Sequence, residues 1–189
     1  LLDAKKIANL IQAHADSKFP FLVSSTGVIG VEIPIGLIEQ NIQRFDLSNK
    51  GGEKFSRAII TTDSKTKNIA VKVKSKSGDY TVGGVAKGSG MIHPKMGTML
   101  GYITTDAKVS PVILTSIIRD SVNQSFNQID VDGDTSTNDT VVIMSNGKSG
   151  VEISHDNDKD LFHEAVMFVS KFLAKQIAED GEGITHLIT

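Results

Sequence analysis

The stretch 87–107 is the part of the chain that most restricts its fold. Glycines and Pro94 interrupt its first half, which excludes a regular helix or a central strand there. Its second half, residues 98–105, is apolar and β-branched, as a buried strand would be. We therefore expect a glycine-rich loop that brings Thr98, directly preceded by Gly97, to the start of a strand.

A threonine in that position has a chemical use. If the bond between Gly97 and Thr98 is broken, Thr98 becomes N-terminal, and its free α-amine has an unperturbed pKa of about 7.7–8.0. Such an amine can take the proton of the neighbouring hydroxyl, and this pair is a known form of activated nucleophile. The alternative is structural: a glycine-rich turn before a core strand, with Thr98 merely filling it.

The rest of the chain interleaves helical and strand patterns, which indicates the α/β class. Helices are expected over residues 3–14, 36–48, 52–61, 110–124 and 159–179, and strands over 19–25, 68–74, 80–86, 98–105 and 140–144. With 189 residues and 39% hydrophobic content, the chain is long enough for one domain with a substantial core. The order of the strands does not follow from the sequence.

Three other positions carry polar groups in settings that suit a site. The motif Ser25-Thr-Gly-Val-Ile-Gly30 follows an expected strand, where exposed N–H groups could form an oxyanion hole, although most such turns are only turns. Lys87 ends an expected strand beside the loop; a solvated strand-end lysine is the alternative. Glu182 lies between two glycines on a tightly turned backbone, which a surface turn after a helix also explains.

Composition excludes several classes of protein. The net charge of -2 gives no sign of binding to nucleic acid or to anionic membranes. The chain has no cysteine, which excludes disulfides and cysteine-built metal sites. No segment approaches the roughly 18 apolar residues of a membrane span, and the N-terminus does not have the pattern of a signal peptide. A cytoplasmic protein without a membrane partner is expected.

The sequence also departs from common ligand-binding motifs. The acidic run Asp130-Val-Asp-Gly-Asp134 is not an EF-hand, because the loop's sixth and twelfth positions are Thr135 and Val141. The glycines before residue 91 lack the spacing of a nucleotide-binding loop. The five histidines lack the spacing of a zinc site, and turn filling explains His93. No metal is expected.

Four stretches, taken in order, resemble the ornithine acetyltransferases, bifunctional glutamate N-acetyltransferases of arginine biosynthesis. They are Ser25-Thr-Gly-Val-Ile-Gly30, the segment from Lys87-Gly-Ser-Gly-Met-Ile through Met96-Gly-Thr-Met-Leu to Thr105-Asp-Ala, Asp132-Gly-Asp-Thr-Ser-Thr-Asn-Asp-Thr140, and Gly181-Glu-Gly-Ile-Thr185. The resemblance implies a layered α-β-β-α sandwich with mixed sheets, as in the self-cleaving aminopeptidase and ornithine acetyltransferase superfamily. Because family members extend beyond both ends of this chain, it also implies a partial chain.

The resemblance further implies a reaction. The single catalytic domain 1–189 would cleave itself between Gly97 and Thr98 by an acyl shift onto the hydroxyl. The new N-terminal threonine would accept acetyl from N-acetylornithine and pass it to glutamate by a ping-pong route. No metal or organic cofactor is implied, and acetyl-CoA as an alternative acetyl donor is left open.

The family's site residues map onto this sequence one by one. Thr98 would be the nucleophile, Thr26 and Gly27 the oxyanion hole, and Lys87 and Glu182 the polar groups that contact the substrate. The stretch from Asp132 to Thr140 would supply hydrogen bonds that position the catalytic loop.

The two segments produced by cleavage would stay associated, in a heterotetramer. Residues 1–97 hold 14 Lys and Arg against 8 Asp and Glu, whereas residues 98–189 hold 6 against 14, so the segments attract each other. A chance asymmetry is the alternative, because exposed charges are screened beyond about 10 Å.

The sequence departs from the family at two positions of the loop. Lys95 and Gly97 stand where the family usually has asparagine and alanine; glycine still permits cleavage, and Lys95 has no assigned role. Two other functions stay open: a self-processing aminopeptidase or amidase of the same superfamily, and an inactive fragment.

Overall fold

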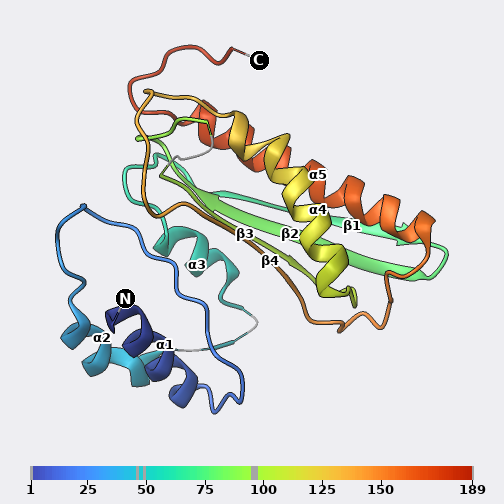
Figure 1. Ribbon diagram of the computed structural model, residues 1–189, viewed down its shortest axis with the longest axis horizontal. Helices are drawn as coiled ribbons and strands as arrows, with labels where there is room; N and C mark the ends of the chain where they lie inside the picture. The colour runs from blue at the N-terminus through green and yellow to red at the C-terminus, as the bar shows by residue number, and fades with distance from the viewer. Residues whose placement is uncertain (1, 46, 49, 95–97, 189) are drawn as a thin grey trace. The chain divides into compact units, whose positions relative to one another are not determined.

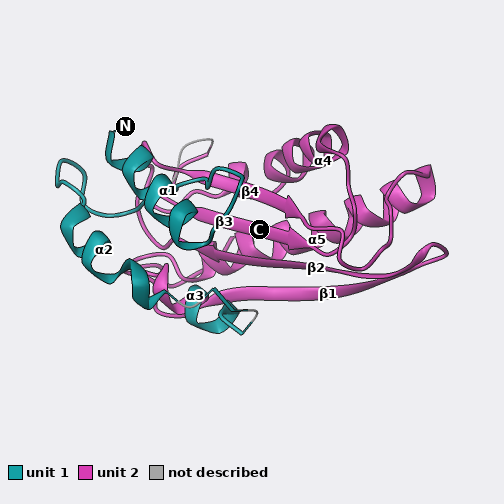
Figure 2. Ribbon diagram, turned by 90° about the horizontal axis from the view of Figure 1, so that it is seen from below, with its two compact units in different colours: residues 1–55 teal, residues 56–189 magenta. Residues whose placement is uncertain are grey.

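The computed structural model describes residues 2–45, 47–48, 50–94 and 98–188 (Figure 1). The chain divides into two compact units, residues 1–55 and residues 56–189, which we call the first and the second unit (Figure 2).

The first unit is helical. Its elements are α1 (Leu2–His14), α2 (Ile35–Asn41), the 3-10 helix η1 (Ile42–Arg44) and the start of α3 (Gly52–Ala58). An ion pair of 2.7 Å between Lys6 and Glu39 joins α1 to α2, and the ring of His14 lies 2.9 Å from the carbonyl oxygen of Phe45. The expected first helix is confirmed, whereas the helices expected over 36–48 and 52–61 both end earlier.

The strand expected over residues 19–25 is wrong. The described residues of the first unit contain no strand, and this segment pairs with none. Pro20 cannot donate to a β-ladder, and the side chains of Phe19 and Leu22 are 78% and 82% exposed. The apolar run therefore has neither the pairing nor the burial that a core strand requires.

The second unit is built on a mixed sheet of four strands in the order β1-β2-β3-β4. The strands are β1 (Lys67–Ser75), β2 (Gly78–Lys87), β3 (Leu100–Thr105) and β4 (Thr140–Ser145). The first three are antiparallel neighbours, and β4 runs parallel to β3 after a crossover through α4 (Pro111–Asn123). The side chain of Ser110 caps α4 by accepting from the Ile113 amide, with Pro111 at the first helical turn. The α/β class is confirmed.

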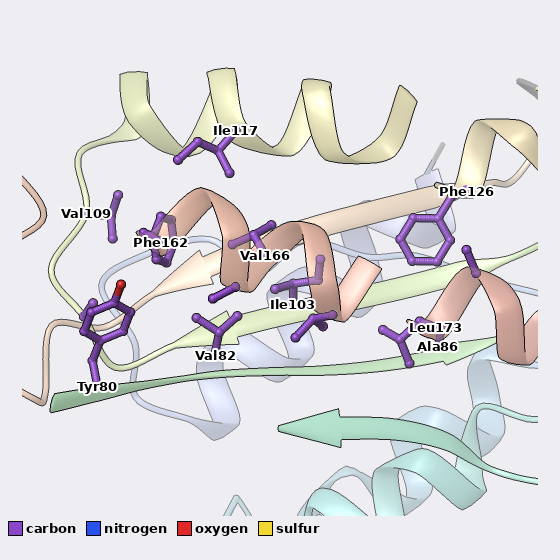
Figure 3. Close-up of a cluster of buried hydrophobic side chains, with 14 of the residues drawn as sticks. Tyr80, Val82, Ala86, Ile103, Val109, Ile117, Phe126, Phe162, Val166 and Leu173 are labelled. Atoms are coloured by element: carbon purple, nitrogen blue, oxygen red, sulfur yellow. The ribbon is translucent and has the colours of Figure 1, made fainter. Parts of the chain in front are cut away.

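One face of the sheet carries the core. Figure 1 shows α4 and the long helix α5 (Asp156–Glu179) along this face, and both helices contact each other and the sheet. Figure 3 shows the buried cluster to which Phe162, Val166 and Leu173 of α5 and Val82 and Ala86 of β2 belong. Alternate residues of the strands point to this face, as the alternation in the sequence predicts.

The apolar residues at helical spacing in this segment predict a buried stripe that includes Val166, Phe172, Leu173 and Ile177. Val166, Leu173 and Ile177 are fully buried, but Phe172 is 36% exposed, and Phe162, which lies outside the predicted stripe, is fully buried. The helix also begins three residues before the predicted start, so Asp156 and Asp158 lie in its first turn, where they interact favourably with the helix dipole. Across the described part of the chain, no helix has the length and apolar character needed to cross a membrane.

Candidate active site

The loop between β2 and β3, residues 88–99, is the centre of the candidate site, and we call it the site loop. It leaves the sheet at Lys87 and returns at Leu100, which are register partners in neighbouring antiparallel strands. Its two ends therefore lie side by side. Gly97, the residue expected before the cleaved bond, and Lys95 lie outside the described residues.

Thr98 is held by its backbone and has a buried hydroxyl. Its amide donates to the carbonyl oxygen of Met91 over 2.6 Å, and Met91 itself has a positive φ of 55°. Its Oγ1 is buried, and within the described chain it has no hydrogen-bond partner. Because buried hydroxyls are almost always hydrogen-bonded, such an atom calls for an explanation, and a reactive role is one.

Lys87 is fully enclosed and is not a solvated strand-end lysine. Its side chain is buried, with a relative exposure of 1% for the residue. Burial lowers the pKa of its ammonium, and the nearby carboxylates of Asp63 and Asp139 offset only part of that effect. The next residue, Gly88, packs so closely that a Cβ there would lie 3.1 Å from the Thr98 carbonyl oxygen. The backbone segments that carry Lys87 and Thr98 are thus in direct contact.

Glu182 contacts the same loop from the end of the chain. Its amide donates to the carbonyl oxygen of Ser89 over 2.6 Å. Its carboxylate lies over Gly90, where an added Cβ would stand only 2.8 Å from the carboxylate carbon. A side chain at Gly90 would therefore displace this carboxylate from its place over the loop. The structure brings Glu182, Lys87 and Thr98 to one loop.

Two aspartates hold the site loop in place, as expected for the stretch 132–140. Asp132 accepts from the amides of Met91 and Ile92, over 2.6 and 3.0 Å. Asp139 accepts from the Met99 amide over 3.0 Å. Partial burial acts to raise the pKa of Asp132, but the amide hydrogen bonds outweigh it and the pKa lies below its usual value. The expected support of the loop by this stretch is confirmed.

Thr26 and Gly27 belong to the first unit, in the segment between α1 and α2. Gly27 has a φ of +150°, which side-chain-bearing residues rarely adopt, although a Cβ there would meet nothing within 4 Å. Backbone conformation, rather than lack of space, therefore explains this glycine. The role of both residues as an oxyanion hole stays a prediction.

A buried ionic cluster near the site loop escaped the sequence analysis. We call Lys67, Asp63 and Asp180 the Lys67 cluster; its ammonium lies 2.5 Å from an oxygen of each carboxylate. Lys67 stands at the first position of β1, one residue before the predicted strand. The spacing of the residues could have revealed the cluster. Lys67 lies two residues before Ile69, so both side chains point to the same face of the strand, which is the core face.

Metal binding finds no support in the described side chains, where no group of three or more His, Asp or Glu is placed to hold an ion. The acidic run 130–134 is engaged in local hydrogen bonds instead. Asp130 accepts from the amide of Gly133, and Asp132 accepts from the amide of Asp134 in addition to those of the site loop.

Known proteins resemble this chain over nearly all of its length. The model of the ArgJ family matches residues 1–189. The chain is 49% identical over 188 residues to the arginine biosynthesis bifunctional protein ArgJ of Thermotoga neapolitana, covering 98% of this chain and 47% of that protein. It is 47% identical over 169 residues to the ArgJ protein of Dehalococcoides mccartyi, covering 88% and 42%.

Another relative carries a name that states an activity. The chain is 44% identical over 190 residues to the glutamate N-acetyltransferase of Methanococcus maripaludis, covering 97% of this chain and 45% of that protein. The chain spans less than half the length of each of these three relatives. The four motifs thus identified the family correctly, and the chain belongs to the ArgJ family.

Proposed function

We propose that this chain carries the nucleophile of a glutamate N-acetyltransferase of arginine biosynthesis, and that the nucleophile is Thr98. The observation that carries the proposal is the meeting of Lys87 and Glu182 at the loop that presents the buried hydroxyl of Thr98, for which the described residues offer no hydrogen-bond partner. The names of the curated relatives support the reaction class.

The first step of the proposed mechanism produces the nucleophile. The Thr98 hydroxyl oxygen attacks the carbonyl carbon of Gly97, and the peptide C–N bond breaks as the ester C–O bond forms. Water then hydrolyses the ester, which leaves a carboxylate on Gly97 and a free amine on Thr98. The products are the segments 1–97 and 98–189, which stay associated in the proposal.

The second stage transfers acetyl. The Thr98 amine takes the hydroxyl proton, the oxygen attacks the acetyl carbonyl of N-acetylornithine, and ornithine leaves with its amine protonated. The amine of glutamate then attacks the acetyl ester and restores the hydroxyl. Thr26 and Gly27 would donate to the oxyanion of each tetrahedral intermediate. The ammonium of Lys87 disfavours protonation of the Thr98 amine and can contact a substrate carboxylate, and Glu182 can contact an amine.

The proposal includes the architecture and setting expected of such an enzyme. The mixed sheet with α4 and α5 on one face is compatible with half of an α-β-β-α sandwich. A heterotetramer of cleaved segments, a cytoplasmic location and use of small-molecule substrates belong to the same proposal.

Denaturing mass spectrometry of the purified 20.3 kDa chain tests the proposal directly. We expect two species, one of which begins at Thr98 and gains one acetyl group on incubation with N-acetylornithine. Addition of glutamate should remove that acetyl and produce N-acetylglutamate; acetyl-CoA is tried as donor in the same assay. An aminopeptidase or amidase would instead hydrolyse peptide or amide substrates without acetylating glutamate. A single intact species that takes up no acetyl contradicts the proposal.

The rate of acetyl transfer should depend on pH through the protonation state of Lys87. Because burial lowers its pKa, the ammonium loses its proton at a lower pH than an exposed lysine does, and the rate should fall as pH rises through that pKa. Lys87→Met should lower the rate at neutral pH on the order of a hundredfold and lose this alkaline limb. The acid limb, set by the Thr98 amine, should remain.

A lysine in an exposed ion pair provides the control. Lys72 on β1 pairs with Asp79 at 2.8 Å, and 64% of its side chain is exposed. Lys72→Met should therefore keep the wild-type pH profile. An alkaline limb that persists in Lys87→Met would show that another group titrates.

A further inference from the structure

The Lys67 cluster is fully enclosed in the second unit. The side chains of Lys67 and Asp63 have no exposed surface, and that of Asp180 is 5% exposed. One ammonium contacts both carboxylates at 2.5 Å, which fixes the distance between two segments far apart in the sequence. Asp63 precedes β1, and Asp180 follows α5.

Each carboxylate also holds a segment of the candidate active site. Asp63 accepts from the amide of Gly88 over 2.7 Å, directly after Lys87. Asp180 lies two residues before Glu182 and accepts from the amide of Ser64 over 3.0 Å and from the Ser64 hydroxyl. The cluster is therefore a bridge between the start of the site loop and the turn that carries Glu182.

Both carboxylates keep their charge in this enclosure. Burial acts to raise the pKa of Asp63, but hydrogen bonds from the Gly88 amide and from Lys67 outweigh it and the pKa lies below its ordinary value. The pKa of Asp180 is lowered in the same way, against burial, by hydrogen bonds from Lys67 and Ser64. The bridge is thus ionic under ordinary conditions.

Stability alone is a poor reason for such a cluster. A buried ion pair contributes little more than well-packed apolar side chains of the same volume, because both charges lose their hydration. Lys67 occupies a core-facing position of β1, where Ile69 and Val71 follow with the same parity and pack against the core. An apolar residue would suit that position, so the ammonium needs a reason beyond packing.

We propose that Lys67 is a positioning residue: its ammonium, between Asp63 and Asp180, holds the turn of Glu182 in register with the loop that follows Lys87. The part of this inference that concerns catalysis rests on the proposed function. The part that concerns geometry stands on the contacts of the cluster alone.

Hydrogen exchange of the full chain, followed by mass spectrometry, tests the geometric part. In Lys67→Met, amides of residues 88–92 and 181–184 should exchange about tenfold faster or more, because the contacts that order them are lost. The core strands, residues 80–86 and 100–105, should keep wild-type exchange. Lys72→Met, on the same strand but in an exposed ion pair, should change neither set.

Two milder variants keep the test decisive where Lys67→Met does not fold. Asp180→Asn retains the shape of the side chain but removes its charge, and Ser64→Ala removes one hydrogen bond of the same carboxylate. Both should speed exchange at residues 181–184 while the core strands stay protected. Wild-type exchange in those residues, or an equal increase along the whole chain, would overturn the inference.

The catalytic part has its own readout. A displacement of about 1 Å in a catalytic group can lower a rate on the order of a hundredfold, so Lys67→Met and Asp180→Asn should lower kcat for acetyl transfer by about that factor. Lys72→Met should not. If the wild-type chain neither cleaves itself nor transfers acetyl, the proposed function fails, but the exchange comparison still decides whether Lys67 positions the two segments.

Discussion

Replacing Thr98 by alanine is expected to abolish both cleavage before residue 98 and uptake of acetyl. Both reactions require the Thr98 hydroxyl oxygen as the attacking atom, and alanine offers no substitute. Intact mass after incubation with N-acetylornithine measures both at once. Thr98→Ser keeps the hydroxyl and should retain both. Thr104→Ala, which changes an exposed threonine of the strand β3 that follows the site loop, is the matched control and should behave as wild type.

The free energy of unfolding of a Thr98 variant distinguishes a reactive threonine from the structural alternative, in which Thr98 only fills a turn. Its Oγ1 is buried without a hydrogen-bond partner among the described residues, so Thr98→Val, which replaces the hydroxyl by a methyl group, should raise the free energy of unfolding by about 1 kcal/mol. Urea unfolding measures this. A valine variant that is inactive yet at least as stable supports a reactive threonine; retained cleavage, or a clear loss of stability, contradicts it.

The sequence predicted the site loop well because its signals are local. Glycines and Pro94 define an irregular segment, and β-branched residues mark the strand that follows. The aspartates of the stretch 132–140 were expected to support the loop only through the family resemblance. Their hydrogen bonds to the amides of Met91, Ile92 and Met99 join segments about forty residues apart, which no local pattern specifies.

The Lys67 cluster shows what a local pattern overlooks. The alternation of Ile69, Val71 and Val73 predicts a strand over residues 68–74, and β1 begins one residue earlier, at Lys67. The parity of Lys67 placed it on the core face, and a lysine there requires a buried carboxylate. The position of Lys67 in the strand thus indicates that it has a buried acidic partner. That Asp180 is such a partner follows only from the fold, because Asp180 lies far along the chain.

The errors in the expected elements have a common cause. An apolar run such as residues 19–23 is consistent with a buried strand, but burial depends on whether another segment offers a free edge. In α5, Phe162 and Phe172 both fit an apolar stripe, and only the packing on β1 and β2 selects Phe162. Tertiary contacts, rather than local preference, decided both cases.

Gly84→Ala is expected to destabilise the second unit, because α5 packs directly on the backbone of β2 at this residue. A Cβ on Gly84 would lie 2.5 Å from Val169 Cγ1 and 2.8 Å from Leu173 Cδ1, so two fully buried side chains of α5 must move. Overpacking of this kind costs about 1–3 kcal/mol in the free energy of unfolding. The urea concentration at the midpoint of unfolding should fall accordingly.

The neighbouring glycine is the matched control. Gly83 points to the opposite face of the sheet, and a Cβ there would meet its nearest atoms at 3.7 Å, an ordinary contact. Gly83→Ala should therefore leave the free energy of unfolding within about 0.5 kcal/mol of wild type. Equal losses in the two variants would mean that backbone preference, and not the approach of α5, determines the need for glycine. A loss confined to Gly84→Ala would assign this glycine to helix packing, a role that its place in the sequence beside Gly83 does not reveal.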